Sequence, residues 1–312
     1  MEAFKTSRRL GYATRYTPQD TQAVKVVRVE LKTPSDKIAA GLVKLSRRIF
    51  DFVTRYKHAS PEAAIEELKR QGKTDLGLQE LRKQGFLMTP AQWNARILFL
   101  ESIAGVPGLV AGVLRHLQSI RRLKRDGGWV ATTIQEAENE RMHLSCWLKI
   151  AKPGLFMRWT IIMAQGVFFN AFFLAYLISP RAAHRFVGCL EEEAVLTYTQ
   201  ILDEIKRGHL PEWENLEVPQ IAKDYWRMPQ DASMTDLVEQ IRADEAGHRF
   251  VNHTLANLKG DDINPFAIKH PDPVVQGTRA CFERQESLEW TEKAAKEIRE
   301  QIEKNAAQSK LH

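Results

Sequence analysis

Apolar residues recur at a spacing of three to four positions along most of this chain, which is the spacing of one face of an α-helix. No segment shows the alternation of apolar and polar residues that is typical of a half-buried strand. The pattern therefore predicts an all-α protein. The predicted helices cover residues 38–56, 89–120, 131–150, 159–178, 182–206, 237–258 and 281–305.

One predicted helix, residues 159–178, carries no charged side chain and is long enough to span a bilayer. It contains Gln165 and Asn170, and Arg158 and Arg181 flank it. Three interpretations stay open from this pattern alone: a transmembrane helix, a buried core helix, or a helix that lies in the membrane interface.

The helix predicted over residues 89–120 has an almost wholly apolar centre, yet Glu101 lies within it. A carboxylate in apolar surroundings is costly unless it is paired or binds a metal. Ala104, Gly108 and Gly112 follow at a spacing of four, which predicts a flat face that another helix can approach closely.

The net charge of +6 is concentrated in residues 1–57 and in a basic cluster at residues 115–125. Within residues 38–56 the basic positions accompany an apolar stripe, which favours contact with an anionic membrane surface. Nucleic acid is not expected as a partner, because stacking aromatics are not interleaved with the basic residues and no nucleic-acid motif is present. The stripe consists of Ile38, Leu42, Leu45, Ile49, Phe50 and Val53.

The chain of 312 residues divides by composition into three predicted parts. These are a poorly ordered N-terminal arm (residues 1–37), a helical bundle domain (38–266) and a charged C-terminal extension (267–312), with a charged surface insertion near residues 60–84. The first 28 residues weakly resemble a mitochondrial presequence. The three widely spaced cysteines predict neither a disulfide framework nor a thiolate metal site.

Two short runs have the form Glu-x-x-His, namely Glu140 with His143 and Glu245 with His248. Residues three apart share a helix face, so each run directs a carboxylate and an imidazole at one point. Two such helices, together with one Glu from each of two further helices, form the ligand set of a carboxylate-bridged di-metal site in a four-helix bundle. Carboxylates with imidazoles suit iron or manganese.

Two further carboxylates are needed, and Glu101 is the first candidate. The second comes from the run Glu191-Glu192-Glu193. Glu191 and Tyr198 are seven positions apart and share a face, whereas Glu193 lies roughly 200° around the helix from Glu191. If Tyr198 lies close to the metals, Glu191 is therefore the ligand.

Several longer motifs closely resemble the alternative oxidases, the cyanide-insensitive terminal ubiquinol oxidases of mitochondria. The resemblance covers residues from about Arg47 to Phe266 and favours fungal or protist members. The plant members' regulatory cysteines have no counterpart near the N-terminus here. The motifs are LESIAGVPG (100–108), RHL (115–117), NERMHL (139–144), HRFVGCLEEEAVLTYT (184–199) and RADEAGHRFVNHT (242–254).

This resemblance implies a ferritin-like four-helix bundle that holds two iron ions, with additional helices lying in one leaflet of the inner mitochondrial membrane on the matrix side. Residues 159–178 would then be an interface helix. His116 falls in a region that helps form a homodimer in family members. The implied iron ligands are Glu101, Glu140, His143, Glu191, Glu245 and His248.

The resemblance also assigns roles around the metals. Tyr198 matches a redox-active tyrosine, and Asn139, Asp244 and Trp226 match residues that orient the ligands by hydrogen bonds. The residues matched to the quinol pocket are Arg96, Thr197, Leu100, Glu193, Ala194 and Arg47.

The implied reaction is the oxidation of ubiquinol and the reduction of dioxygen to water, without proton pumping. Two other kinds of protein compete with this interpretation. One is another di-iron enzyme, such as a plastid-type quinol oxidase, a quinone hydroxylase or a ferroxidase. The other is a non-catalytic membrane-associated scaffold, in which the Glu and His side chains form a buried polar network without metal.

Overall fold

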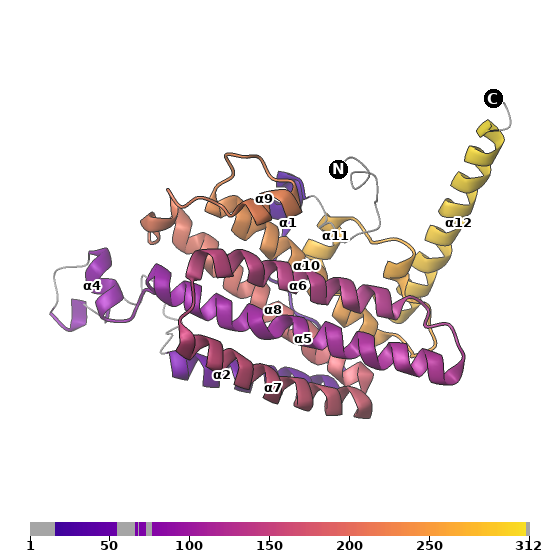
Figure 1. The fold of residues 1–312 in the computed structure, drawn as a ribbon, viewed down its shortest axis with the longest axis horizontal. Coiled ribbons are helices and arrows are strands. Elements are labelled where there is room, and N and C mark those ends of the chain that lie inside the picture. The colour runs from indigo at the N-terminus through magenta and orange to yellow at the C-terminus, as the bar shows by residue number, and fades with distance from the viewer. Residues whose placement is uncertain (1–15, 55–65, 68, 73–76, 310–312) are drawn as a thin grey trace.

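Four long helices form the centre of the computed structural model, which describes residues 16–54, 66–67, 69–72 and 77–309. They are α5 (Pro90–Arg122), α6 (Trp129–Ala151), α8 (Pro180–Lys206) and α10 (Met234–Asn257). α5 packs on α6 and α8 packs on α10, and the four run along the long axis of the molecule (Figure 1). Since the described residues contain helices and no strand, the predicted all-helical bundle is confirmed.

The bundle helices α5, α8 and α10 each begin at a residue whose side chain accepts a hydrogen bond from a free backbone N–H group. Thr89 caps α5 in a reciprocal pair with Gln92, and Ser233 caps α10 in the same way with Asp236. Ser179 caps α8, whose first residue is a proline. Such local signals explain why the predicted and observed bounds of the long helices differ by only a few residues.

Two further helices, α2 (Pro34–Thr54) and α7 (Leu155–Ile178), lie along the lower edge of the bundle in Figure 1. α2 packs on α8, while α7 packs on α5 and α8. On α2 the small residues Ala39, Ala40 and Val43 face the protein. The exposed side carries the larger apolar residues of the predicted stripe: Ile38, Leu42, Leu45 and Ile49. The last predicted residues of this helix, 55 and 56, lie outside the described residues.

Most of the apolar surface of α7 is exposed, and its buried side chains are Phe172 and Tyr176. The interpretation of residues 159–178 as a buried core helix is therefore wrong. α5 and α7 are both long and apolar enough to cross a membrane, by length and composition only. Much of the apolar part of α5 is covered by protein, so α7 has the larger exposed apolar face of these two helices.

A segment that we call the strap, residues 16–32, runs from α1 (Pro18–Ala23) in extended form to the start of α2. α1 contacts α10 and α11 (Pro273–Thr278), and the Lys25 amide donates to the Gly277 carbonyl at 3.0 Å. The strap falls within the arm predicted over residues 1–37, whose first fifteen residues lie outside the described part.

Shorter elements complete the chain. Of the insertion predicted near residues 60–84, the structure describes residues 66–67, 69–72 and 77–84, including α4 (Leu78–Lys83). The charged C-terminal helix, α12 (Arg284–Ser309), projects away from the bundle (Figure 1). The remaining elements are η1 (Pro211–Trp213), α9 (Gln220–Trp226) and η2 (Pro265–Ala267).

The predicted flat face of α5 packs against α6. A Cβ atom on Gly108 would lie 2.5 Å from the Thr133 carbonyl oxygen, and one on Gly112 would lie 2.6 Å from the Ile134 side chain. Glycine therefore sets the distance between the two helices. This distance matters for function, because α5 carries Glu101 and α6 carries Glu140 and His143.

We expect Gly108→Ala to lower the free energy of unfolding by about 1–3 kcal/mol, since the added methyl meets backbone and forces α5 away from α6. The measurement is thermal unfolding in detergent. Gly41→Ala on α2 is the control, because no atom lies within 4 Å of the added Cβ. A midpoint for Gly108→Ala equal to that of the control would contradict the packing argument.

Candidate metal centre

Six ligand-type side chains from all four bundle helices converge in two groups. The first contains Glu101, Glu140, His143 and Glu245, and the second contains Glu140, Glu191, Glu245 and His248. Within each group the candidate ligand atoms lie within 4.8 Å of one another. Glu140 and Glu245 belong to both groups, so each has the position of a carboxylate that could bridge two metal ions.

The two imidazoles approach the shared carboxylates from opposite groups. His143 Nδ1 lies 3.5 Å from Glu140 Oε2 and 3.3 Å from Glu245 Oε1, and 3.5 Å from Glu101 Oε2. His248 Nδ1 lies 2.6 Å from Glu140 Oε1 and 3.8 Å from Glu245 Oε2. All these side chains are nearly excluded from solvent, with His143 fully buried.

The inward-facing atoms of this cluster lie close to one another but make no hydrogen bond of acceptable geometry, although buried polar atoms are normally paired in this way. They are Glu101 Oε2, both carboxylate oxygens of Glu140, Glu245 Oε2, and the Nδ1 atoms of His143 and His248. A cation would satisfy all of them at once. The residues therefore fit a pair of divalent metal ions with oxygen and nitrogen ligands, which suits iron or manganese.

The pKa values of the cluster follow from burial and from the neighbouring charges. Burial raises the pKa of Glu101 to about 8. Burial also raises the pKa of Glu191 well above its usual value, and the charges of Glu245 and Glu140 raise it further. Burial opposes ionisation of Glu140 as well, but the charges of His143 and His248 outweigh it and lower that pKa. Ionising all four carboxylates therefore requires added positive charge.

Asp244 orients His143, and the residues predicted to surround the ligands meet at this carboxylate. Its Oδ2 lies 3.2 Å from His143 Nε2 and accepts hydrogen bonds of 2.9 Å from Asn139 Nδ2 and Trp226 Nε1. A proton on His143 Nε2 donated to Asp244 leaves the Nδ1 lone pair facing the carboxylate cluster. Sequence reasoning missed Tyr225, whose hydroxyl accepts from Asn139 at 3.0 Å.

Tyr198 lies directly against this cluster. Its hydroxyl donates a hydrogen bond to Glu101 Oε1 and accepts one from Trp147 Nε1 at 3.2 Å. Burial, together with the charge of Glu101, raises the tyrosine's pKa well above its usual value. Tyr198 thus lies beside the carboxylate–histidine cluster, and Glu191, rather than Glu193, belongs to that cluster.

The residues matched to a quinol pocket form a charged network beside α2. Arg47 Nη1 donates at 3.1 Å to both Glu193 Oε2 and Thr197 Oγ1, and Arg47 Nε donates to Asp51. Arg96 Nη2 donates to the same Asp51 at 2.5 Å. Asp51 was missed, although its i, i+4 spacing from Arg47 is a recognisable helical ion-pair signal.

Two other residues matched to the pocket, Leu100 and Ala194, are half-buried. Leu100 directly precedes Glu101 on α5, and Ala194 lies four positions before Tyr198 on α8. They therefore lie on the helices that carry Arg96 and Glu193.

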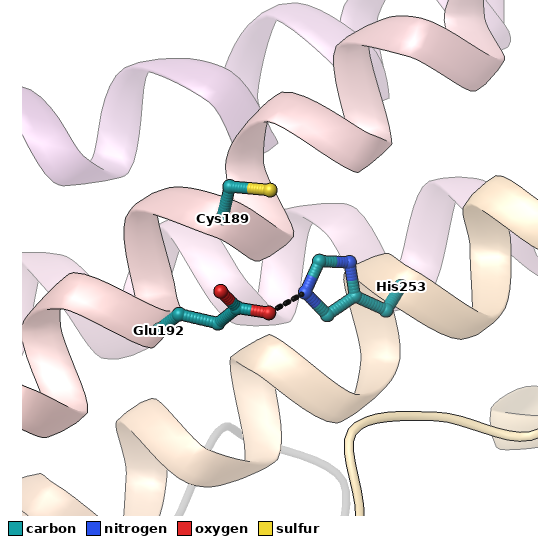
Figure 2. Close-up of side chains that lie close together, drawn as sticks. All are labelled: Cys189, Glu192 and His253. Carbon is teal, nitrogen blue, oxygen red and sulfur yellow. Dashed lines mark hydrogen bonds and ion pairs between the residues drawn. The ribbon is translucent and has the colours of Figure 1, made fainter. Parts of the chain in front are cut away.

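A third group of ligand-type side chains, Cys189, Glu192 and His253, is buried between α8 and α10 (Figure 2). Arg185 Nη1 donates to His253 Nδ1 at 3.0 Å, so His253 Nε2 carries the proton and donates to Glu192 Oε1, also at 3.0 Å. Both ring nitrogens of His253 are thus engaged, since Nδ1 accepts a hydrogen bond and Nε2 carries the proton, so neither nitrogen has a free lone pair to bind a metal. The group is therefore a hydrogen-bond relay rather than a metal site. Gly188 gives the imidazole its space, since a Cβ there would lie 2.4 Å from His253.

A second buried relay runs from Glu136 on α6 through α10 and α8 to α7. Asn252 Nδ2 donates to Glu136 at 2.7 Å, the Asn252 oxygen lies 3.0 Å from His184 Nδ1, and His184 Nε2 lies 3.1 Å from the Tyr176 hydroxyl. Burial lowers the pKa of His184 to about 4 and raises that of Glu136 to about 7. His184 is therefore neutral in the folded protein at neutral pH.

His184 should make stability depend on pH. Its folded pKa of about 4 lies below the unfolded value of 6.5, so its contribution is complete above pH 6.5 and is lost as the pH falls towards 4. Each unit of pKa difference corresponds to about 1.4 kcal/mol. We expect the thermal midpoint of the wild type to fall more steeply than that of His184→Gln between pH 6.5 and 4.5. Parallel curves for the two proteins would exclude this role.

Comparison with known proteins agrees with this geometry. The family model described as "Alternative oxidase" matches residues 16–257, and so begins at the strap. "Alternative oxidase, mitochondrial" from Cryptococcus neoformans var. grubii is 49% identical over 276 residues, which cover 88% of this chain and 68% of that protein. The protein of the same name from Emericella nidulans is 53% identical over 260 residues, covering 83% and 69%.

A further relative of that name, from Aspergillus niger, is 50% identical over 260 residues, again covering 83% of this chain and 69% of that protein. The residues matched by the family model include all four bundle helices and every residue of the two carboxylate–histidine groups. The chain therefore belongs to the alternative oxidase family, the terminal oxidases that oxidise quinol and reduce dioxygen to water without pumping protons.

Proposed function

We propose that this chain is a cyanide-resistant ubiquinol oxidase whose reaction centre is a pair of iron ions. The observation that carries the proposal is the set of inward-facing ligand atoms that converge on one another without making a hydrogen bond of acceptable geometry. Glu140 and Glu245 would bridge the ions, because they belong to both groups. The remaining ligands are Glu101, His143, Glu191 and His248.

The bound iron pair would supply the electrons that reduce dioxygen and take them back from quinol. The protein residues create the conditions for this exchange. Asp244 holds the proton of His143 at Nε2, which keeps Nδ1 available as a ligand. Burial of the four helices around the cluster excludes bulk water, which strengthens each electrostatic interaction within it.

Tyr198 is the residue we assign to catalysis. Its hydroxyl donates to Glu101, one of the proposed iron ligands, and its surroundings strongly favour the protonated form. It can therefore retain its proton at neutral pH and release that proton together with an electron while dioxygen is reduced. A tyrosine placed only for packing would not need a hydroxyl in contact with a ligand.

The quinol would bind beside Arg96, Thr197 and Glu193, within the network that Arg47 and Asp51 complete. Cationic and hydroxyl donors there can orient the oxygens of the quinol head group. Leu100 and Ala194 are assigned to the apolar wall of this pocket. Thr197 precedes Tyr198 directly, which connects the proposed pocket with the cluster through one helix.

The exposed apolar faces of α2 and α7 would lie in one leaflet of the membrane, with basic residues meeting anionic head groups. The three relatives described above are named as mitochondrial proteins. We therefore assign this chain to the matrix side of the inner mitochondrial membrane, with residues 38–266 as the membrane-bound catalytic domain. A homodimer is proposed through the exposed His116 region of α5.

The direct test is oxygen uptake by the iron-loaded protein in detergent, with a short-chain ubiquinol and with cyanide present. We expect rapid uptake, which Glu140→Ala should abolish together with iron binding, because Glu140 belongs to both groups. Tyr198→Phe should retain iron and lose most of its activity. Full activity in Tyr198→Phe would remove the tyrosine from the chemistry.

Two results would redirect the proposal. Iron bound without quinol-dependent uptake would indicate a hydroxylase or a ferroxidase that uses the same ligands. Absence of both iron and uptake would favour a scaffold in which the polar cluster binds no metal.

Membrane attachment can be tested by flotation with vesicles that contain anionic phospholipid. The double variant Ile162→Glu/Val167→Glu places two charges on the exposed face of α7, so we expect a smaller floating fraction. Ile298→Glu/Ile302→Glu, at exposed positions of the projecting α12, is the matched control and should float like the wild type. Equal flotation of both variants would argue against α7 as the membrane face.

A further inference from the structure

The strap is held along α8 and α10 by buried polar side chains. Arg242 Nη2 donates to the Thr21 carbonyl at 2.8 Å, and Arg249 Nη1 donates to the Lys25 carbonyl at 2.9 Å. The Val29 amide donates to Glu192 Oε1 at 2.6 Å, the same oxygen that receives the His253 proton (Figure 2). Both arginines are largely buried, so their bonds to strap carbonyls fix its position strongly.

This fixed position brings Tyr16 to the carboxylate that orients His143. The Tyr16 hydroxyl donates to Asp244 Oδ1 at 2.7 Å. The other oxygen, Oδ2, receives Asn139, Trp226 and His143. Among the described residues, Tyr16 is the donor that occupies Oδ1, so both oxygens of Asp244 are engaged.

We propose that Tyr16 is a positioning residue of the metal centre, acting on His143 through Asp244. A carboxylate held at only one oxygen can rotate, whereas donors at both oxygens set its plane and thereby the direction of the His143 ring. The strap is thus a part of the metal site's support that comes from outside the four-helix bundle. This inference rests on the proposed iron site, because it requires His143 to be a ligand.

The strap does not need Tyr16 in order to dock. Thr21 Oγ1 donates to Glu239 at 2.9 Å, and the arginine and Glu192 contacts hold the segment further along. Loss of the Tyr16 hydroxyl should therefore leave the strap in place and change only the support of Asp244. Thr21→Val provides the complementary change, since it weakens docking without touching Asp244.

The experiment compares wild type, Tyr16→Phe and Thr21→Val as iron-loaded full chains in detergent. Two quantities are measured: the rate at which iron is lost to a chelator, and the Mössbauer spectrum of the bound iron. We expect Tyr16→Phe to lose iron about tenfold faster, the lower end of the effect typical of residues that orient metal ligands. Its spectrum should differ from that of the wild type, while Thr21→Val matches the wild type in both.

Three outcomes would overturn the inference. Wild-type iron retention and an unchanged spectrum in Tyr16→Phe would show that Asp244 does not need this donor. Equal changes in Tyr16→Phe and Thr21→Val would assign the effect to docking of the strap instead. A wild-type protein that binds no iron would overturn the proposed function itself, and this inference with it; the first two outcomes leave the proposed function standing.

Discussion

Four carboxylates buried at one place are the constraint around which this molecule is organised. Like charges within a few ångströms in a low-dielectric interior repel strongly, and burial adds a further penalty for each ionised group. The two histidines offset only part of this, and several carboxylate oxygens make no hydrogen bond. An interior of this kind is stable when cations complete it, so folding and metal binding are expected to be coupled. The helices supply the rigidity that holds the carboxylates together.

Two devices provide that rigidity. Glycines at 108 and 112 bring α5 so close to α6 that their ligands meet, and buried relays of hydrogen bonds tie α6, α8 and α10 to one another and to α7. The relay through Asp36 is similar in kind, since Arg185 contacts both Asp36 on α2 and His253 on α10. Each relay satisfies its buried polar atoms, which stabilises one arrangement of the helices over others.

Much of this could be predicted from the sequence, because the information is local. Caps, helical periodicity and the three-residue spacing of Glu140 with His143 lie within single helices. The spacing of Glu191 and Tyr198 selected the carboxylate of the triplet that lies in the cluster. Contacts between remote segments could not be predicted in this way. Tyr16 reaches Asp244 across 228 positions, and no periodicity marks it. The relay through His184 could not be predicted from the sequence either, since no sequence pattern identifies the partners of a buried histidine.

The strap also has a consequence for the order in which the molecule is completed. It precedes every bundle helix in the chain, yet the carboxylate that Tyr16 contacts lies on α10, the last of them. Closing so long a loop is entropically unfavourable until the intervening helices have packed. The strap is synthesised early but is thus among the last segments to dock. A nascent chain that lacks α10 also lacks the arginine and carboxylate side chains of that helix that hold the strap. The contact between Tyr16 and Asp244 can therefore form only after the last bundle helix, α10, has been synthesised.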